Sequence, residues 1–335
     1  MKIGSVDLDR EILVVAEIGN NHEGDLALAE DLIGLAARAG AQAVKFQTIV
    51  PERLVAPDQT QRLAQLRRFR LDADAHNRLA AVAAREGVLF MSTPFAIEAV
   101  AMLDPLVPAF KIASGDNDFV PLLEAVAATA KPVILSTGMT GLGGAAAAQA
   151  ALERVWRARG FDPGLVLLHC ASVYPAAPAD ANIRALVALA ALGRPVGYSD
   201  HTLGIDAALG AVALGARVIE KHFTRSKTHS DFRDHALSAE PDELRELVAR
   251  ARAIAACLGD GVKRPVAGEA ATAAAARRSI CAARALPAGH VLRIEDLDWL
   301  RPAGGLSPGN EAALLGRALK FDVAAGARLL VESVA

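Results

Sequence analysis

The chain has 335 residues, of which 53% are hydrophobic, and its charges nearly cancel to a formal net charge of −2. This length allows one large domain and a small one, and a pI of about 6.5 argues against a nucleic-acid or membrane-surface partner. Three widely spaced cysteines, no signal-peptide core and no membrane-length apolar run predict a soluble cytoplasmic protein.

A repeat of apolar strand, turn and amphipathic helix runs from residue 12 to residue 257. Eight such repeats in about 250 residues are typical of a (β/α)8 TIM barrel, which we expect over residues 1–258. A doubly wound open sheet is the alternative, but the Gly-x-Gly-x-x-Gly turn expected after its first strand is missing. The predicted strands are 12–17, 41–47, 88–93, 109–113, 132–137, 165–169, 195–199 and 217–222.

The pattern changes after the last predicted helix. Residues 259–277 are rich in Gly, Pro, Lys and Ala, which predicts a linker. Short strand-like runs at 279–283, 291–292 and 329–331 are separated by turn residues and predict a small, mainly β domain over 278–335. A domain of this size is marginal alone and would gain stability by docking on a partner.

Polar residues stand at the carboxyl end of each predicted strand, where a barrel places its chemistry. Several of them are two residues apart, so strand alternation puts both members of each pair on the same face. The strand ends carry Glu17, Lys45 and Gln47, Thr93, Lys111 and Ser114, Thr137, His169, Ser199 and His201, and Glu220 and His222.

Two of these residues, His201 and His222, end consecutive predicted strands and have carboxylates beside them in Asp200 and Glu220. Neighbouring parallel strands lie about 4.8 Å apart, so both imidazoles would emerge side by side. Imidazole is the commonest nitrogen ligand of divalent transition metals. The pair therefore predicts a metal site.

Lys45 and Lys111 each interrupt an otherwise apolar strand. A buried lysine is costly unless an anion pairs with it, so the two lysines indicate a bound phosphate or carboxylate. Together with the histidines they predict a metal-assisted reaction of a phosphorylated or carboxylated small molecule. Two alternatives are a Schiff-base aldolase with Lys111 as nucleophile, which would need no metal, and a sugar-binding protein without activity.

The motifs resemble those of the sialic acid synthase family, and the resemblance runs nearly end to end. It includes the tail, which is similar to the antifreeze-like (SAF) domain that ends these proteins. The motifs are AEIGNNHEGD at 16–25, STPF at 92–95, KIASGDN at 111–117, LSTGM at 135–139, HCASVYP at 169–175, GYSDHTLG at 197–204, IEKHFT at 219–224 and the tail segment 277–305.

The resemblance implies a condensation of phosphoenolpyruvate with an N-acetylmannosamine-type aldose to give a nonulosonic acid. It implies His201 and His222 as ligands of Mn²⁺ or Mg²⁺, and Glu17 as the residue that orients water or moves a proton. It also implies Arg301 as a residue that reaches the acetamido group in the partner subunit's barrel of a domain-swapped homodimer. Implied phosphoenolpyruvate contacts are Lys45, Lys111, Thr93, Ser114, Tyr174 and Ser199, and implied contacts near the sugar are Gln47 and Asp234.

Departures from the family pattern bear on the acceptor sugar. Ser172 stands where an asparagine is usual, Asp116 replaces a glutamate, and the stretch after Gln47 is shorter than in typical members. We keep Asp116 and Ser172 as substrate-binding candidates. The acceptor could be N-acetylmannosamine, a diacetamido-deoxy hexose or another hexose derivative, and the alternative function is a synthase of another 3-deoxy sugar acid. The resemblance also covers His22, whose role the sequence leaves open between shaping its loop and capping the helix on one side and a direct catalytic role on the other.

Overall fold

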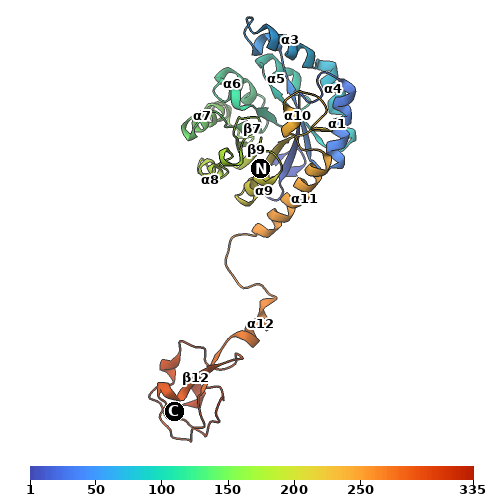
Figure 1. Ribbon diagram of the computed structural model, residues 1–335. Coiled ribbons are helices and arrows are strands. Elements are labelled where there is room, and N and C mark those ends of the chain that lie inside the picture. The colour runs from blue at the N-terminus through green and yellow to red at the C-terminus, as the bar shows by residue number, and fades with distance from the viewer. The chain divides into compact units, whose positions relative to one another are not determined.

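The computed structural model describes residues 1–335, and the chain divides at Gly259 into a first unit, Met1–Gly259, and a second unit, Asp260–Ala335 (Figure 1). The first unit holds one parallel sheet with the strand order β5-β4-β3-β10-β9-β8-β7-β6. Its two end strands, β5 and β6, also lie in contact, so the sheet closes into a nearly complete barrel. The strands are β3 (Leu13–Gly19), β4 (Ala43–Thr48), β5 (Leu89–Pro94), β6 (Phe110–Ile112), β7 (Val133–Ser136), β8 (Leu165–His169), β9 (Val196–Asp200) and β10 (Val218–His222).

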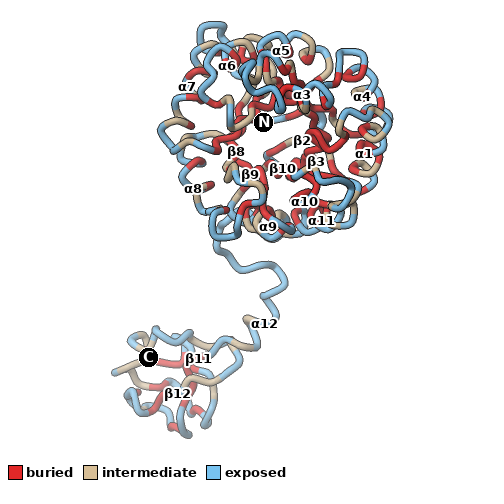
Figure 2. Tube along the Cα trace, turned by 45° about the horizontal axis from the view of Figure 1, so that its top comes forward, coloured by how far each residue is buried: buried red, intermediate tan, exposed pale blue.

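Each of these strands overlaps one predicted strand, and the predicted TIM barrel is confirmed. Helices surround the strands, and Figure 2 shows the buried strands enclosed by this ring. The helices of the first unit are α1 (Leu26–Arg38), α2 (Pro51–Leu54), α3 (Thr60–Phe69), α4 (Ala73–Arg85), α5 (Ile97–Leu103), α6 (Val120–Ala127), α7 (Leu142–Arg159), α8 (Ala185–Ala190), α9 (Asp206–Ala213), α10 (Asp234–Leu237) and α11 (Pro241–Leu258).

Strand alternation sorts the apolar residues of the barrel into two layers. In β3, Val14 and Ala16 pack outward against the helices, whereas Leu13 and Val15 belong to a separate cluster inside the barrel. Glu17 continues the inward series at the carboxyl end of the strand. The inward face thus changes from apolar to polar along the strand, and the same change recurs in the other strands.

A short antiparallel hairpin, β1 (Lys2–Ile3) and β2 (Val6–Asp7), precedes the barrel and was not predicted. Its side chains Ile3 and Val6 are buried in the inner cluster. Leu13, Ala43 and Val218 in that cluster are the first residues of their strands. The hairpin therefore closes the amino-terminal end of the barrel and leaves the carboxyl end for the site.

The second unit contains helix α12 (Glu269–Ala276), which lies inside the predicted linker, and a two-stranded antiparallel sheet of β11 (Ser279–Ala282) and β12 (Leu297–Leu300). The strand predicted at 279–283 is confirmed, but β12 was missed. At 291–292, only Val291 forms a bridge, with Ala318. The strand predicted at 329–331 is wrong, because Val331 begins a turn of 3₁₀-helix in which the Ser333 hydroxyl accepts the Leu330 N–H at 3.1 Å.

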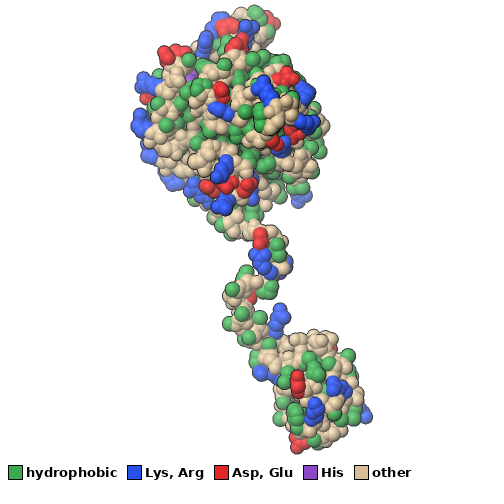
Figure 3. All heavy atoms as spheres, turned by 180° about the vertical axis from the view of Figure 1, so that it is seen from behind, with side chains coloured by type: hydrophobic (Ala, Val, Ile, Leu, Met, Phe, Trp, Pro, Cys, Tyr) green, Lys and Arg blue, Asp and Glu red, His purple; other side chains and the backbone are tan.

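The surface carries charges of both signs, in agreement with the near-zero net charge, and the helices are of ordinary length and polarity. On the face shown in Figure 3, basic and acidic side chains are interspersed in both units. No helix combines the length and the hydrophobicity that a membrane crossing requires.

A buried carboxylate in the second unit carries a stability prediction. Asp296 is 1% exposed and accepts from His290 Nε2 at 2.7 Å and from Arg284 at 2.6 Å. The hydrogen bond from His290 is the largest influence that lowers the pKa of Asp296. A lowered pKa means that the ionised group stabilises the fold above the unfolded pKa of about 3.9, and that this contribution is lost as the pH falls.

We therefore expect Asp296→Asn to lower the unfolding midpoint of the second unit at pH 7 by several degrees, measured by calorimetry on the full chain. The difference should shrink below pH ~4, because wild-type Asp296 then becomes protonated too. The exposed neighbour Glu295 supplies the control Glu295→Gln, which should leave the midpoint unchanged. Equal midpoints for Asp296→Asn and the wild type at pH 7 would contradict this role.

Candidate active site

Inward-facing side chains at the carboxyl ends of the strands line a cavity of about 280 Å³. The strand register brings them together, since Glu17 lies opposite both Lys45 and His222 on the adjacent strands. The predicted site residues that line this cavity are Glu17, Lys45, Gln47, Thr93, Lys111, Ser114, Ser172, Tyr174, Ser199, His201, His222 and Asp234.

Two buried lysines and two buried glutamates form the floor of the cavity. Lys45 Nζ lies 2.6 Å from Glu17 and 3.7 Å from Glu220. Lys111 Nζ lies 3.7 Å from Glu220 and donates to Ser136 Oγ at 2.7 Å. The protein itself therefore supplies carboxylate partners for the lysines, whose anionic partner we expected only in the substrate.

Neighbouring polar groups hold these charges in place. Thr93 Oγ1 accepts from Lys45 at 3.0 Å, and Ser199 donates to Glu220 at 2.9 Å. Gln47 donates to Glu17 at 3.1 Å. Fixed hydrogen bonds of this kind give each charged group one orientation before a ligand arrives.

The two glutamates differ in their affinity for a proton. Burial raises the pKa of Glu17 to about 7, against the opposing charge of Lys45, and the charge of Glu220 adds to the rise. Burial also acts to raise the pKa of Glu220, but Lys111 and Lys45 outweigh it and lower the pKa to about 2. Glu17 can therefore take up or release a proton near neutral pH, whereas Glu220 stays ionised.

The lysines respond to the same balance of burial and charge. Burial acts to lower the pKa of Lys45, but Glu17 and Glu220 outweigh it and raise the pKa above the ordinary value. Burial dominates at Lys111 and lowers its pKa, because Glu220 opposes it from a longer distance.

His201 and His222 lie on neighbouring parallel strands, as predicted, with ring centroids 5.5 Å apart. His201 Nδ1 lies 2.8 Å from the Ala171 carbonyl oxygen, so it donates there and leaves Nε2 free as a ligand atom. His222 Nδ1 is buried without a hydrogen-bond partner. Burial lowers the pKa of both rings, and neutral imidazole is the form that binds metal. These residues fit a divalent ion.

One wall of the cavity comes from the loop after β10. Asp234 accepts from Arg233 Nε at 3.1 Å, and the Arg233 guanidinium lies 4.9 Å from the centre of the Tyr174 ring. Tyr174 in turn lies against His201 with ring centroids 4.3 Å apart. An aromatic ring, a guanidinium and a carboxylate thus face the cavity beside the histidine pair.

Two predicted site residues lie outside the cavity lining. Asp116 ends the 3₁₀ turn Ser114–Asp116, where burial raises its pKa to about 6, and one of its oxygens is buried without a partner. Arg301 is exposed in the second unit, directly after β12.

Three other sequence-based interpretations can be compared with the structure. Asp200 faces outward because it alternates with Ser199, and it pairs with Lys221 at 3.0 Å, so it does not join the histidines. His22 is fully buried, and its Nδ1 accepts the Gly24 N–H at 3.0 Å, a contact that favours the loop-shaping role of the two left open. His169 lies outside the cavity lining and contacts the Ala181 carbonyl oxygen at 2.9 Å.

Several lining residues were missed by the sequence analysis. Strand alternation could have identified Ser136, since it follows inward-facing Ile134 by two residues in β7 and therefore also faces inward. The others stand in loops or on α3, where no strand period indicates which way a side chain points. The missed residues that line the cavity are Asn20, Arg62, Phe95, Ala113, Gly115, Ser136, Met139, Phe232 and Arg233, whereas Glu220 was named at a strand end and beside the histidines without a role of its own.

A closed parallel barrel whose polar cavity at the strand ends holds paired lysines, glutamates and histidines defines the class as a barrel enzyme. Comparison with known proteins identifies the family. Residues 32–263 match the NeuB family, and residues 277–331 match the SAF domain. The chain belongs to the NeuB family and ends in a SAF domain, as the resemblance implied.

Named relatives and a solved structure agree with this family. The chain is 38% identical to the N,N'-diacetyllegionaminic acid synthase of Legionella pneumophila, covering 96% of this chain and 94% of that one. It is also 38% identical to the enzyme of the same name from Campylobacter jejuni, over 92% and 96% of the two chains. The N-acetylneuraminic acid synthetase of Leptospira borgpetersenii, solved with citrate, matches with a TM-score of 0.76 and 34% identity over 81% and 94% of the chains.

Proposed function

We propose that this enzyme condenses phosphoenolpyruvate with an N-acetylmannosamine-type aldose to give a nonulosonic acid and phosphate. The observation that carries the proposal is the meeting of two buried lysines with a histidine pair at the mouth of a NeuB-family barrel. The terminal methylene carbon (C3) of phosphoenolpyruvate forms the new bond to the aldehyde carbon, and the aldehyde oxygen takes a proton. Water then adds to the adjacent carbon (C2) and gives up a proton, and the bond from C2 to the phosphate oxygen breaks.

Lys45 and Lys111 are the groups that would hold the carboxylate and phosphate of phosphoenolpyruvate. Their ammonium groups share Glu220 as a neighbour at 3.7 Å in each case, and Lys45 also lies 2.6 Å from Glu17, so Lys111 is the less neutralised of the two. Thr93, Ser114 and Ser199 add hydroxyl groups to the lining of the cavity. Hydroxyl and ammonium donors together suit the oxygen atoms of both anionic groups.

Glu17 is the proposed proton carrier. Its pKa of about 7 allows it to hold a proton for the aldehyde oxygen or to accept one from the attacking water. Gln47 donates to it and thereby fixes the direction of the carboxylate. His201 and His222 would hold Mn²⁺ or Mg²⁺, and such an ion supplies Lewis-acid polarisation of the sugar carbonyl when bound.

The acceptor sugar would lie above the phosphoenolpyruvate site, between Gln47 and the Asp234 wall. Similarity to two N,N'-diacetyllegionaminic acid synthases supports a diacetamido-deoxy hexose as one acceptor to test. N-acetylmannosamine remains the second, and a synthase of another 3-deoxy sugar acid is the alternative function.

The test is phosphate release from phosphoenolpyruvate with Mn²⁺, across N-acetylmannosamine, its 6-phosphate, diacetamido-deoxy hexoses, mannose and arabinose 5-phosphate. We expect release with one N-acetylated sugar and its loss on adding a chelator. Release with arabinose 5-phosphate alone would favour the alternative function. If folded enzyme releases no phosphate with any of these sugars, the proposed substrates are contradicted.

Arg301 supplies a prediction about the dimer. The proposed domain swap brings it to the acetamido group in the partner subunit's barrel, so Arg301→Ala should raise the KM for the sugar at least about tenfold, as the loss of a charged hydrogen bond does. The KM for phosphoenolpyruvate should change far less. Steady-state kinetics with each substrate varied in turn measures both, with the exposed Arg293→Ala in the same unit as control. Equal rises in both KM values would contradict the assignment.

A further inference from the structure

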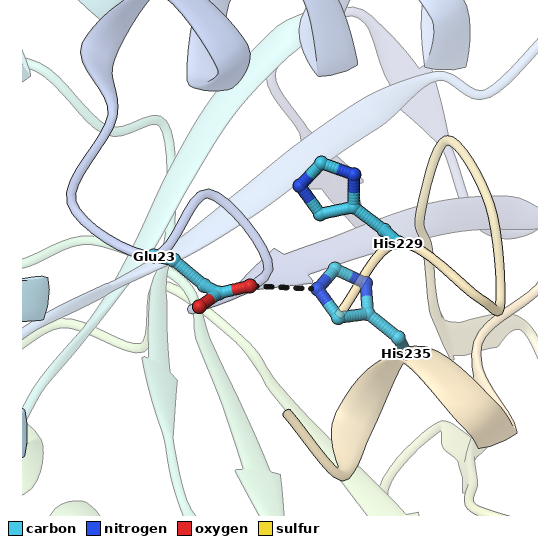
Figure 4. Close-up of side chains that lie close together, drawn as sticks. All are labelled: Glu23, His229 and His235. Atoms are coloured by element: carbon cyan, nitrogen blue, oxygen red, sulfur yellow. Dashed lines mark hydrogen bonds and ion pairs between the residues drawn. The ribbon is translucent and has the colours of Figure 1, made fainter. Parts of the chain in front are cut away.

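A second cluster of potential metal ligands lies outside the cavity described above. Glu23 stands in the loop between β3 and α1, His229 stands in the loop after β10, and His235 stands on the short helix α10 (Figure 4). β3 and β10 are hydrogen-bonded neighbours, so their two loops meet at the same edge of the barrel. In Figure 4 the three side chains point toward one another.

The spacing of the donor atoms suits a small divalent ion. One ligand atom from each of the three residues lies within 4.8 Å of the other two, and no other such trio of carboxylate, thiol or imidazole donors occurs in the chain. Glu23 Oε1 and His235 Nε2 are 3.4 Å apart. Metal–donor bonds of about 2.1 Å in a tetrahedron place two donors about 3.4 Å apart. Exposed His229 can rotate to complete the set.

The hydrogen bonds of His235 leave its Nε2 suited to an ion. Nδ1 lies 2.7 Å from Thr224 Oγ1, and the Thr224 hydroxyl donates to the Ser226 carbonyl oxygen at 3.1 Å. With the hydroxyl hydrogen used in this way, Nδ1 donates to Thr224 and the lone pair of Nε2 faces the Glu23 carboxylate. Two facing lone pairs repel unless a positive charge lies between them. Arg68 contacts the other carboxylate oxygen, Oε2, and the Ser230 hydroxyl donates to Oε1, which has a second lone pair for the side of the histidines.

We propose that Glu23, His229 and His235 bind a zinc-class transition ion that clamps the β10–α11 loop to the β3–α1 loop. Two imidazoles and one carboxylate favour Zn²⁺ or Co²⁺ over Mg²⁺, which prefers oxygen donors. The ion reaches the cluster through a neighbouring cavity of about 450 Å³, which Glu23 and His229 help to line.

The clamp has a consequence for the active-site wall. The segment between β10 and α11, which carries His229 and His235, also presents Phe232, Arg233 and Asp234 to the active-site cavity. An ion bound on one side of this loop therefore fixes the residues that line the cavity on its other side. It is a positioning site, because none of its three ligands lines that cavity.

The experiment separates this site from the histidine pair His201 and His222. In full-length protein with His201→Gln and His222→Gln, freed of metal by a chelator, we expect equilibrium dialysis to retain one Zn²⁺ per chain. Co²⁺ in its place should give the visible absorption of a tetrahedral ion. Adding His229→Gln should weaken Zn²⁺ binding at least tenfold, and because His229 is exposed this change should not disturb folding.

Asp31→Asn is the matched control, since Asp31 lines the neighbouring cavity but is not in the trio, and it should leave Zn²⁺ affinity unchanged. Hydrogen exchange in residues 225–237 should slow on adding Zn²⁺ to the protein that keeps His229, and should not slow in the His229→Gln variant. No bound Zn²⁺ in the double variant, equal affinity with and without His229, or unchanged exchange in this loop would each overturn the proposal.

Discussion

His222→Gln is expected to reduce turnover more than about 100-fold, because ligand loss costs at least as much as loss of a group that supports a ligand. The ring of His222 is buried beside His201, and no neighbouring group accepts from or donates to its Nδ1. Since the neutral imidazole makes no hydrogen bond at Nδ1, its replacement by glutamine should change the stability of the fold little. The expected defect is therefore in metal binding and activity, and not in folding.

Three measurements check this result. Phosphate release reports turnover, calorimetric titration with Mn²⁺ reports ion binding, and circular dichroism reports the fold. His169→Gln is the control, because His169 lies outside the cavity lining and glutamine can still donate to the Ala181 carbonyl oxygen. Wild-type turnover in His222→Gln, or undiminished Mn²⁺ affinity, would remove the metal assignment.

Glu17→Gln is expected to lower kcat by about 10²–10⁴, the range typical of lost general acid–base catalysis. It should also remove the ionisation near pH 7 from the pH dependence of kcat, because Glu17 is the buried carboxyl whose pKa is raised to about 7. As the pH rises through this value, Glu17 loses its proton, so a step that uses it as an acid slows on the alkaline side. A step that uses it as a base slows on the acid side.

Glu220→Gln is the matched control for this experiment. Glu220 is also buried and also faces Lys45, but its pKa is about 2 and it does not titrate in the working range. We expect Glu220→Gln to lower activity while the ionisation of Glu17 stays in the profile at a lower pH, because the charge of Glu220 contributes to the raised pKa of Glu17. If that ionisation survives in Glu17→Gln, another group is the proton carrier.

The barrel strands could be predicted from sequence because a parallel strand buried on both faces gives a continuous β-branched apolar run. The polar ends of those runs then identified Glu17, Lys45 and His222, since alternation alone decides which side chains face inward. The same reasoning could not find Arg62 or Met139, which reach the cavity from a helix and a loop. No period in the sequence indicates how such segments fold over a barrel.

The second unit was harder to predict, because its strands are short and its turns are held by individual side chains. Trp299 in β12 donates from its ring to Glu311 at 2.8 Å, a contact between segments that no local pattern connects. The ion pairs of Lys45 were also missed, because a sequence shows the cost of a buried lysine but not which carboxylate offsets it.

Because the hairpin β1–β2 closes one end of the barrel, the interior is accessible from the other end only. With Ile3 and Val6 sealing one end, everything that reacts must arrive and depart through the opposite mouth. Lys45 and Lys111 project from within the strands, whereas Asp234 begins helix α10, beyond the carboxyl end of β10. On the proposed roles, phosphoenolpyruvate binds at the inner position of the cavity and the sugar binds nearer its mouth. We therefore expect the substrates to bind in order, phosphoenolpyruvate first, because a sugar already bound at the mouth would block the entry of phosphoenolpyruvate.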